Sequence, residues 1–344
     1  MRVVFAGTPE FAVPSLRALH EGGHHIALVL TQPDRPAGRG LGQRSSPVKQ
    51  AALDLGLEVD QPASLKSPDA LQRLRAARPD VLVVVAYGLI LPPAALDVAP
   101  LGAVNVHASL LPRWRGAAPI QRSILAGDRE TGITLMRMDA SLDTGPILMQ
   151  ESVPITEEDT AGSLQTRLAT LGAAMLVSRL ERPPFEGRPQ PDSGATYAAK
   201  IMKSESVLIW GLPAQVIART ARAMDPQPGV SSRLGDEMIK LWRLRPAPMP
   251  GQYTARPDAP PPRPVEAAAG LDAANRSQPG AAAAAPGAAA ADPGTVIDVD
   301  DDSIRVACGQ GSVWIGELQR PGGRRLAARD FLRGRAVRPG DRFV

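Results

Sequence analysis

The chain has 344 residues, which is enough for about two domains of ordinary size. Its formal net charge is only +4, but its isoelectric point is about 9.6, a weak indication of a polyanionic partner. Aromatic residues make up 3% of the sequence, which argues against a surface that stacks many unpaired bases. Cys308 is the only cysteine, so an internal disulfide and a multi-cysteine zinc site are both excluded.

The first ten residues, MRVVFAGTPE, contain an apolar run of strand length and lack the hydrophobic region of a signal peptide. No apolar stretch approaches the length needed to cross a bilayer. A single cysteine also fits a reducing compartment. We therefore expect a cytoplasmic protein without a membrane segment.

Apolar segments of strand and helix type alternate through the first half of the chain. Residues 81–86 are apolar throughout, as expected of a central parallel strand covered on both faces. Thr160 is the expected N-cap of the last helix in this half. The other predicted strands are 2–6, 25–30, 103–106, 134–138 and 147–153, and the predicted helices run through Leu16 and Leu19 and over 48–55, 71–77, 119–126 and 160–180. This alternation predicts an α/β domain with a Rossmann-like parallel sheet over residues 1–181.

The remainder of the chain has a different pattern. Residues 182–204 begin with a Pro- and Gly-rich run and predict a linker. A helix is expected at 213–224, followed by strands at 230–234, 238–244, 295–299, 304–308 and 313–318. Five short strands separated by turns fit a small β-barrel, compatible with an OB-fold, over residues 205–344. The Pro- and Ala-rich stretch 246–294 interrupts this barrel and has the composition of a disordered insertion.

A dinucleotide cofactor is an obvious alternative for such a sheet. The first strand is followed by GTPEF, which lacks the G-x-G-x-x-G pattern that lets the backbone approach a pyrophosphate. Gly38, Gly40 and Gly42 do alternate, but they lie among prolines and basic residues rather than at a strand–helix junction. No G-K-[ST] phosphate-loop pattern follows them. A nucleotide cofactor is therefore not expected.

Asn105 and His107 lie where the predicted strand 103–106 ends. They are two residues apart, so an extended chain points both to the same face. Ligands of open α/β sheets bind at the carboxyl ends of strands. Asp143 follows the next apolar strand, in the loop 139–146. An amide, an imidazole and a carboxylate together can stabilise an oxyanion, move a proton and orient the base.

The residue pattern by itself also permits simpler interpretations of these side chains. An isolated Asn-x-His is most often a polar strand end, and His107 could be a core histidine. A metal ion would need more ligands, and the other histidines, His20, His24 and His25, lie far upstream near a helix end.

The sequence around the three residues matches a known family. HASLLPRWRGAAPIQ (107–121), preceded by Asn105 and followed by SLDTGPI (141–147), resembles the 10-formyltetrahydrofolate-dependent formyltransferases. The resemblance is greatest to members that act on initiator methionyl-tRNA, which also match at FAGTPEFAVPSL (5–16), TQPDRPAGRG (31–40) and VVVAYGLILP (83–92). These blocks span most of residues 1–200, so the resemblance makes 1–181 a formyltransferase domain.

The resemblance implies transfer of a formyl group from 10-formyltetrahydrofolate to the amino group of initiator methionyl-tRNA, without a metal, and we expect a monomer. It implies Asn105, His107 and Asp143 as the catalytic residues. It assigns the folate to Tyr87, Gly88, Ile90, Ser109, Leu110, Leu111, Pro112 and Asp139. The apolar members can pack a flat ring, although ordinary core packing explains the leucines equally well.

Two basic regions suit a partner as long as tRNA. Segment 31–50 carries four basic residues against Asp34, and segment 311–344 carries eight arginines against three acidic residues. The resemblance implies that the first segment enters the acceptor end of the tRNA, with Arg35, Arg39, Arg44 and Lys49 as its basic residues, and that the C-terminal domain also binds tRNA. A solvated loop is the commoner meaning of such a run.

Some positions depart from the family pattern. Ala108 replaces a usual Gly, Ile209 a usual Asp and Gln227 a common Trp, while Leu41-Gly42 replaces a frequent Lys pair. None of these touches the three catalytic candidates, so the departures concern tRNA affinity rather than the reaction.

Rival functions follow from the same motifs. Formyltransferases of glycinamide ribonucleotide or of an amino sugar nucleotide share Asn-x-His and the distal Asp, but neither accounts for TQPDRPAGRG or for the basic C-terminal domain. From another class, the chain could be an RNA-binding module on an inactive enzyme fold, against which the complete Asn, His and Asp set argues.

Overall fold

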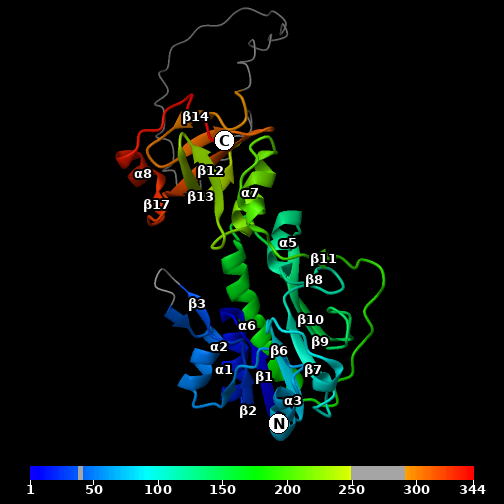
Figure 1. Cartoon of the computed structure of the whole chain (residues 1–344). Helices are drawn as coiled ribbons and strands as arrows, with labels where there is room; N and C mark the ends of the chain where they lie inside the picture. Colours follow the sequence, from blue (N-terminus) through cyan, green and yellow to red (C-terminus); the bar gives the residue numbers. More distant parts are fainter. Residues whose placement is uncertain (38–41, 249–290) are drawn as a thin grey trace, which may run out of the picture. The chain divides into compact units, whose positions relative to one another are not determined.

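The computed structural model describes residues 1–37, 42–248 and 291–344 (Figure 1). Within these ranges the chain forms two compact units. The first comprises Met1–Val207 and Arg219–Val230, and the second comprises Leu208–Ala218 and Ser231–Val344. The predicted linker, 182–204, belongs to the first unit.

A seven-stranded sheet in the order β10-β9-β7-β6-β1-β2-β5 forms the centre of the first unit. The strands are β1 (Arg2–Gly7), β2 (His25–Leu30), β5 (Val59–Asp60), β6 (Val81–Val85), β7 (Ala103–His107), β9 (Glu130–Arg137) and β10 (Ile147–Pro154). From β5 to β7 every neighbouring pair is parallel, which confirms the predicted parallel α/β core. All of β6 is buried, as its unbroken apolar run predicts.

The sheet departs from the predicted parallel arrangement at one edge. β9 runs antiparallel to β7, and β10 runs antiparallel to β9. The connection between β9 and β10 is the short loop 138–146, and a parallel pair would need a crossover of a dozen or more residues. Antiparallel edge strands on parallel sheets are common.

Helices cover both faces of this sheet. On one face, α1 (Val13–Glu21), α2 (Pro47–Asp54), α5 (Pro119–Ala126) and α6 (Ala161–Leu180) share a core with Val3 and Phe5 of β1. On the other, α3 (Pro68–Ala76) and α4 (Pro93–Leu96) pack with Val4 and Ala6. Successive β1 residues thus enter different cores, as the alternation of a strand requires.

Helix α6 lies close to the strand that carries the candidate site. The helix begins at its predicted cap, where Thr160 and Ser163 form a reciprocal capping box. A Cβ atom at Gly172 would lie only 2.7 Å from Cγ1 of Val106 on β7. Gly172 therefore permits the close approach of α6 to β7.

Several short elements were not predicted. In the first unit they are strand β5, helix α4, the 3₁₀ turns η1 (Glu10–Ala12) and η2 (Lys203–Ser206), the hairpin of β3 (Arg35–Ala37) and β4 (Gly42–Arg44), and the parallel pair of β8 (Arg115–Gly116) with β11 (Tyr197–Ala198). The β8–β11 pair attaches the segment 182–204 to the first unit. That segment is thus part of the packed structure around the candidate site.

The second unit contains a separate antiparallel sheet in the order β12-β13-β16-β15-β14, with β17 paired to β16. All five predicted strands are present, and the elements are β12 (Val230–Leu234), β13 (Glu237–Pro246), β14 (Val296–Val299), β15 (Ile304–Ala307), β16 (Ser312–Gln319), β17 (Leu326–Ala327) and α8 (Ala328–Gly334). The predicted helix 213–224 is α7 (Ala214–Ala223), whose residues divide between the two units after Ala218. β17 and α8 were not predicted. Residues 249–290, most of the predicted insertion 246–294, lie outside the described residues. Pro246, the first residue of the predicted insertion, is the last residue of β13.

Among the described helices, none combines the length and the apolar character that a membrane span requires.

Candidate active site

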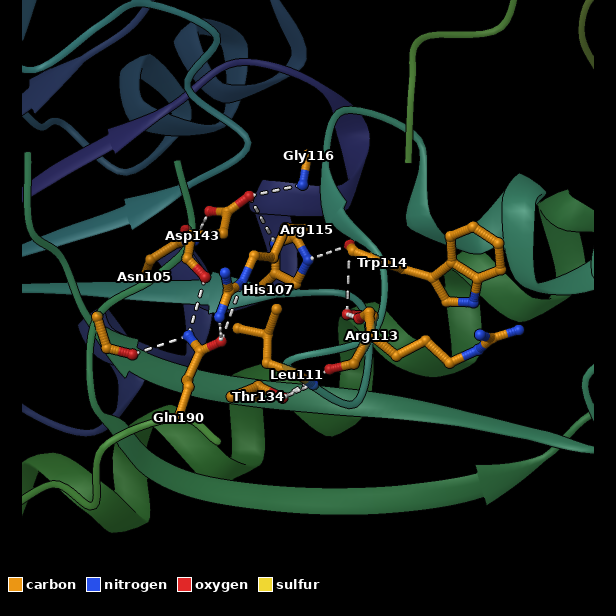
Figure 2. A network of polar contacts seen from close by, with 12 residues as sticks. Asn105, His107, Leu111, Arg113, Trp114, Arg115, Gly116, Thr134, Asp143 and Gln190 are labelled. Carbon is orange, nitrogen blue, oxygen red and sulfur yellow. Dashed lines mark hydrogen bonds and ion pairs between the residues drawn. The ribbon is translucent and has the colours of Figure 1, made fainter. Parts of the chain in front are cut away.

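The three predicted catalytic side chains meet at the carboxyl end of β7 (Figure 2). Asn105 and His107 are buried, with 9% and 6% of their surfaces exposed. Nδ2 of Asn105 donates to Oδ1 of Asp143 at 3.4 Å, and Nδ1 of His107 lies 3.7 Å from Oδ2 of Asp143. The backbone N–H of Gly116 donates to the same Oδ2 at 2.8 Å. The carboxylate is thus placed by both β7 and β8.

The His107 ring lies between two oxygen atoms. Its Nε2 is 2.9 Å from the carbonyl oxygen of Trp114, which can only accept a hydrogen bond, so we assign a hydrogen to Nε2. Its Nδ1 faces the Asp143 carboxylate. At 3.7 Å, Nδ1 is close to the carboxylate but beyond direct hydrogen-bond distance, so the Trp114 carbonyl is the hydrogen-bond partner of the ring.

The loop after β7 is fixed by β9. The Ser109 hydroxyl donates to the Arg113 carbonyl at 2.6 Å, and the Thr134 hydroxyl donates to the Ser109 carbonyl at 2.6 Å. The same Thr134 oxygen accepts the N–H of Leu111 at 3.1 Å. Leu111 packs in a small buried cluster with Met136 and Ile147. Ser109 and Leu111 therefore attach the loop to β9 through Thr134.

Trp114 holds its carbonyl toward His107 while its indole points away (Figure 2). Its N–H donates to Oγ1 of Thr196, and its indole N–H donates to Asp128 at 2.7 Å. Arg113 makes two hydrogen bonds to Asp128 and lies 4.4 Å above the indole ring, so Asp128 raises the pKa of the Arg113 guanidinium. These contacts stabilise the left-handed backbone of Trp114, which has φ of +64°.

Gln190 is a residue near the site that sequence reasoning missed. Its Nε2 donates to the backbone carbonyls of Asp143 and Gly145, both at 2.8 Å, and its Oε1 accepts from Nε and Nη2 of Arg115 at 3.1 and 2.8 Å. Gln190 lies in the Pro- and Gly-rich stretch and is far from Asp143 in the sequence. No periodicity or motif in that stretch pointed to it.

The residues assigned to the folate occupy different environments. Tyr87 packs in the core under the sheet, and burial raises the pKa of its hydroxyl, with Asp60 adding to the shift. The backbone carbonyl of Tyr87 accepts hydrogen bonds from the Thr8 hydroxyl and the Gln32 amide. Gly88 is exposed, and Ile90 is an exposed apolar side chain at 76%.

The remaining folate candidates lie in the loops after β7 and β9. Leu110 is half-buried and lines a cavity of about 240 Å³ with Arg113, Trp114 and Asp128, whereas none of the three catalytic candidates lines it. Pro112 is half-buried and follows a cis peptide bond. Asp139 is exposed and accepts from the Thr144 hydroxyl and the Ser141 N–H, which closes its own loop.

The basic residues of segment 31–50 are not equivalent. Arg35 is exposed and donates to Gln32 at 2.8 Å, whereas Nζ of Lys49 bonds Asp34 at 2.5 Å and Gln61 at 2.7 Å. The hydrogen bonds from Lys49 and Gln61 hold the pKa of Asp34 below its usual value. Arg39 lies outside the described residues, and of Arg44 only the backbone, in β4, is described.

In the part of the chain that the structure describes, no three His, Cys, Asp or Glu side chains are grouped as metal ligands.

Comparison with known proteins defines the class. Residues 1–180 match the family model described as formyl transferase, and residues 200–336 match the model of the formyl transferase C-terminal domain. The two domains of the chain are therefore those of a formyl transferase. A methionyl-tRNA formyltransferase of Aromatoleum aromaticum is 49% identical over the whole chain and 97% of its own length, and one of Chromobacterium violaceum is 47% identical over the whole chain and 99% of its length. The chain belongs to the methionyl-tRNA formyltransferase family.

Solved structures agree on the fold. WlaRD, a sugar 3N-formyl transferase crystallised with dTDP and 5-N-formyl-THF, superposes with a TM-score of 0.59 at 16% identity, over 93% of this chain and 97% of that one. HypX from Aquifex aeolicus superposes with a TM-score of 0.60 at 15% identity, over 98% of this chain. The chain spans about half the length of HypX. At these identities the likeness concerns the fold alone.

Proposed function

We propose that the chain transfers the formyl group of 10-formyltetrahydrofolate to the amino group of initiator methionyl-tRNA, giving N-formylmethionyl-tRNA for translation initiation. The observation that carries the proposal is the convergence of Asn105, His107 and Asp143 at the end of β7. It is supported by 49% identity over the full length to a methionyl-tRNA formyltransferase.

The reaction is a direct attack of the neutral methionyl amine on the formyl carbon. A carbon–nitrogen bond forms, and negative charge builds on the formyl oxygen. The bond between that carbon and N10 of the folate then breaks, N10 gains a proton and the amine loses one. The products are formylated tRNA and tetrahydrofolate.

No covalent nucleophile is required in this scheme. The Ser109 hydroxyl is already bonded to the Arg113 carbonyl. Burial of the Cys308 thiol raises its pKa to about 11, so it is a thiol rather than a thiolate at neutral pH.

The three side chains take separate roles. The Asn105 amide places one donor near Asp143 and can direct its second N–H at the oxyanion. His107 moves the proton between the attacking amine and the leaving nitrogen. Asp143 orients the imidazole and balances its positive charge when it is protonated. The folate is bound by the surrounding loops, with exposed Ile90 and half-buried Leu110 against its ring and the backbone at Tyr87, Gly88, Ser109–Pro112 and Asp139 at its polar edge.

The tRNA is bound by both ends of the chain. Arg35, Arg39 and Arg44 meet the acceptor end, while Lys49 contributes less because Asp34 already balances its charge. The antiparallel sheet of residues 205–344 is an OB-fold-like tRNA-binding domain, separate from the catalytic domain 1–181. The enzyme acts as a cytoplasmic monomer.

The test is formyl transfer to defined acceptors. The protein is incubated with 10-formyltetrahydrofolate and, separately, initiator methionyl-tRNA, elongator methionyl-tRNA, glycinamide ribonucleotide and an amino sugar nucleotide. We expect formylation of the initiator methionyl-tRNA, with the much slower His107→Ala variant as the control. Formylation of one of the small acceptors instead, or of none, would overturn the proposal.

A further inference from the structure

From the contacts of Gln190, we infer that this residue is a positioning residue for the catalytic carboxylate, acting on the Asp143 loop from the stretch predicted to be a linker. The inference rests on the proposed function and extends it. Gln190 donates to the backbone carbonyls of Asp143 and Gly145 rather than to the catalytic side chains (Figure 2).

Gln190 supports the Asp143 loop in addition to the hydrogen bonds that Asp139 accepts within it. Asp143 has φ of +52°, a left-handed conformation that costs energy for a residue with a side chain. Within the described residues, Gln190 is the only donor to the carbonyls of Asp143 and Gly145. Two hydrogen bonds from one amide therefore fix the backbone on both sides of Thr144.

Arg115 determines which way the Gln190 amide points. Its Nε and Nη2 both donate to Oε1, which directs Nε2 at the two carbonyls. The reversed amide would place N–H groups against guanidinium N–H groups and an oxygen against two carbonyl oxygens. The amide is thus held in one orientation, with four hydrogen bonds in all.

The same segment also supports the other contact of the carboxylate. Gly116, whose N–H donates to Asp143, lies in β8, and β8 pairs with Tyr197–Ala198. Thr196 accepts the N–H of Trp114, whose carbonyl faces His107. Residues 190–198 therefore support the neighbours of both Asp143 and His107, and Gln190 is the residue among them that bonds the Asp143 loop directly.

The experiment compares Gln190→Ala and Gln190→Glu with the wild-type chain in steady-state formylation. Gln190→Glu can keep the contact with Arg115 as an ion pair but loses both donors to the loop. We expect kcat to fall roughly 10- to 100-fold in both variants, because a catalytic group displaced by about 1 Å costs about that much. KM for 10-formyltetrahydrofolate and for methionyl-tRNA should stay within about twofold.

Two controls separate positioning from general stability. Gln72→Ala removes an exposed glutamine on α3. Ser163→Ala removes the side-chain half of the capping box of α6, where Ser163 Oγ accepts the Thr160 N–H, and should lower the melting temperature without lowering kcat. Wild-type kcat in either Gln190 variant would overturn the inference, as would a fall in kcat that Ser163→Ala reproduces at equal loss of melting temperature. Absence of formylation by the wild-type chain would instead overturn the proposed function itself.

Discussion

The Asn105 amide donates without carrying a charge that titrates, whereas the neighbouring His107 ring can gain and lose a proton. Asn105→Ala should remove an oxyanion donor and lower kcat roughly 10²- to 10³-fold. His107→Ala should lower kcat roughly 10²- to 10⁴-fold through the loss of proton transfer. Single-turnover formylation measures both, with tRNA affinity measured alongside and expected to change little. Near-normal turnover in either variant would contradict the assignment.

Asp159 is a buried carboxylate whose partners determine its titration. Its Oδ2 accepts from the N–H and hydroxyl of Thr156 and from Arg167, and its Oδ1 accepts from Ser163. Burial alone would raise the pKa of Asp159, but these donors outweigh burial and hold the pKa below its ordinary value. The ionised form is therefore favoured by folding.

The sign of the pH dependence follows from that lowered pKa. The stability contributed by Asp159 is fully present above its unfolded pKa of about 3.9 and is lost as the pH falls through the lower, folded pKa. Asp159→Asn should cost about 2 kcal/mol at pH 7, and its difference from wild type should shrink below about pH 4. Urea unfolding at pH 7, 5 and 3 measures this, with exposed Asp97→Asn as the control. A difference that stays constant with pH would show that the charge of Asp159 is not involved.

The sequence revealed the site residues that lie on a regular strand or in the loop directly after one. Asn105 and His107 could be placed on one face because strand alternation fixes their direction, and Asp143 because it follows an apolar strand. Gln190 could not, because its two carbonyl partners belong to a loop far away in the chain. Side chains that bond the backbone of a distant loop leave no local pattern in the sequence.

At the scale of elements, predictability followed the strength of local signals. Helix α5 was predicted at 119–126 and is found there, since Pro119 favours the first turn and Gly127 adopts the left-handed conformation that ends it. The two-residue strands β8, β11 and β17 are too short to show alternation. Their pairing depends on tertiary contacts that a single sequence does not display.

The contact between α6 and β7 gives a prediction for a single methyl group. Gly172→Ala would gain about 1 kcal/mol of helix propensity, but its Cβ would lie 2.7 Å from Val106 Cγ1. Overpacking of this kind costs about 1–3 kcal/mol, so we expect a net loss of stability together with lower kcat, because β7 carries Asn105 and His107. Urea unfolding and formylation assays measure the two effects. Ala174→Leu, on the exposed face of α6, is the control, and a stabilised, fully active Gly172→Ala variant would show that the helix can move aside.

At the scale of the whole molecule, the Pro- and Ala-rich stretch can be replaced by a linker only if the residues that flank it lie close together. Ala247 bonds Ser312, Ser312 pairs with Ala307, and Ala307 accepts from Gly294. Three neighbouring-strand spacings of about 4.8 Å therefore separate Ala247 from Gly294, a distance of at most about 15 Å. A Gly/Ser linker of about eight residues can span it.

Replacing residues 249–290 by such a linker should leave the melting temperature and formylation close to wild type. The composition of the stretch predicts too little buried apolar surface to offset the entropy of ordering. Thermal unfolding and KM for methionyl-tRNA measure the outcome. A large loss of stability would mean that the stretch packs on the second unit, and a raised KM alone would mean that it contacts the tRNA.

The arginines of segment 31–50 should govern the tRNA and not the folate. Each side chain that neutralises a phosphate steepens the fall of log affinity with log salt by roughly 0.7 to 0.9. Arg39→Ala and Arg44→Ala should therefore raise KM for methionyl-tRNA and flatten the salt dependence, while KM for 10-formyltetrahydrofolate stays constant. Lys49→Ala should do less, because Nζ of Lys49 is already held by Asp34 and Gln61. If an arginine instead contacts bases and positions the acceptor end, kcat should fall as well, since the amine would be misplaced. Both KM values measured over a salt series distinguish these cases. An effect confined to the folate, or no change at all, would contradict the assignment of this segment to the tRNA, and no change at all would mean that it is only a solvated basic surface.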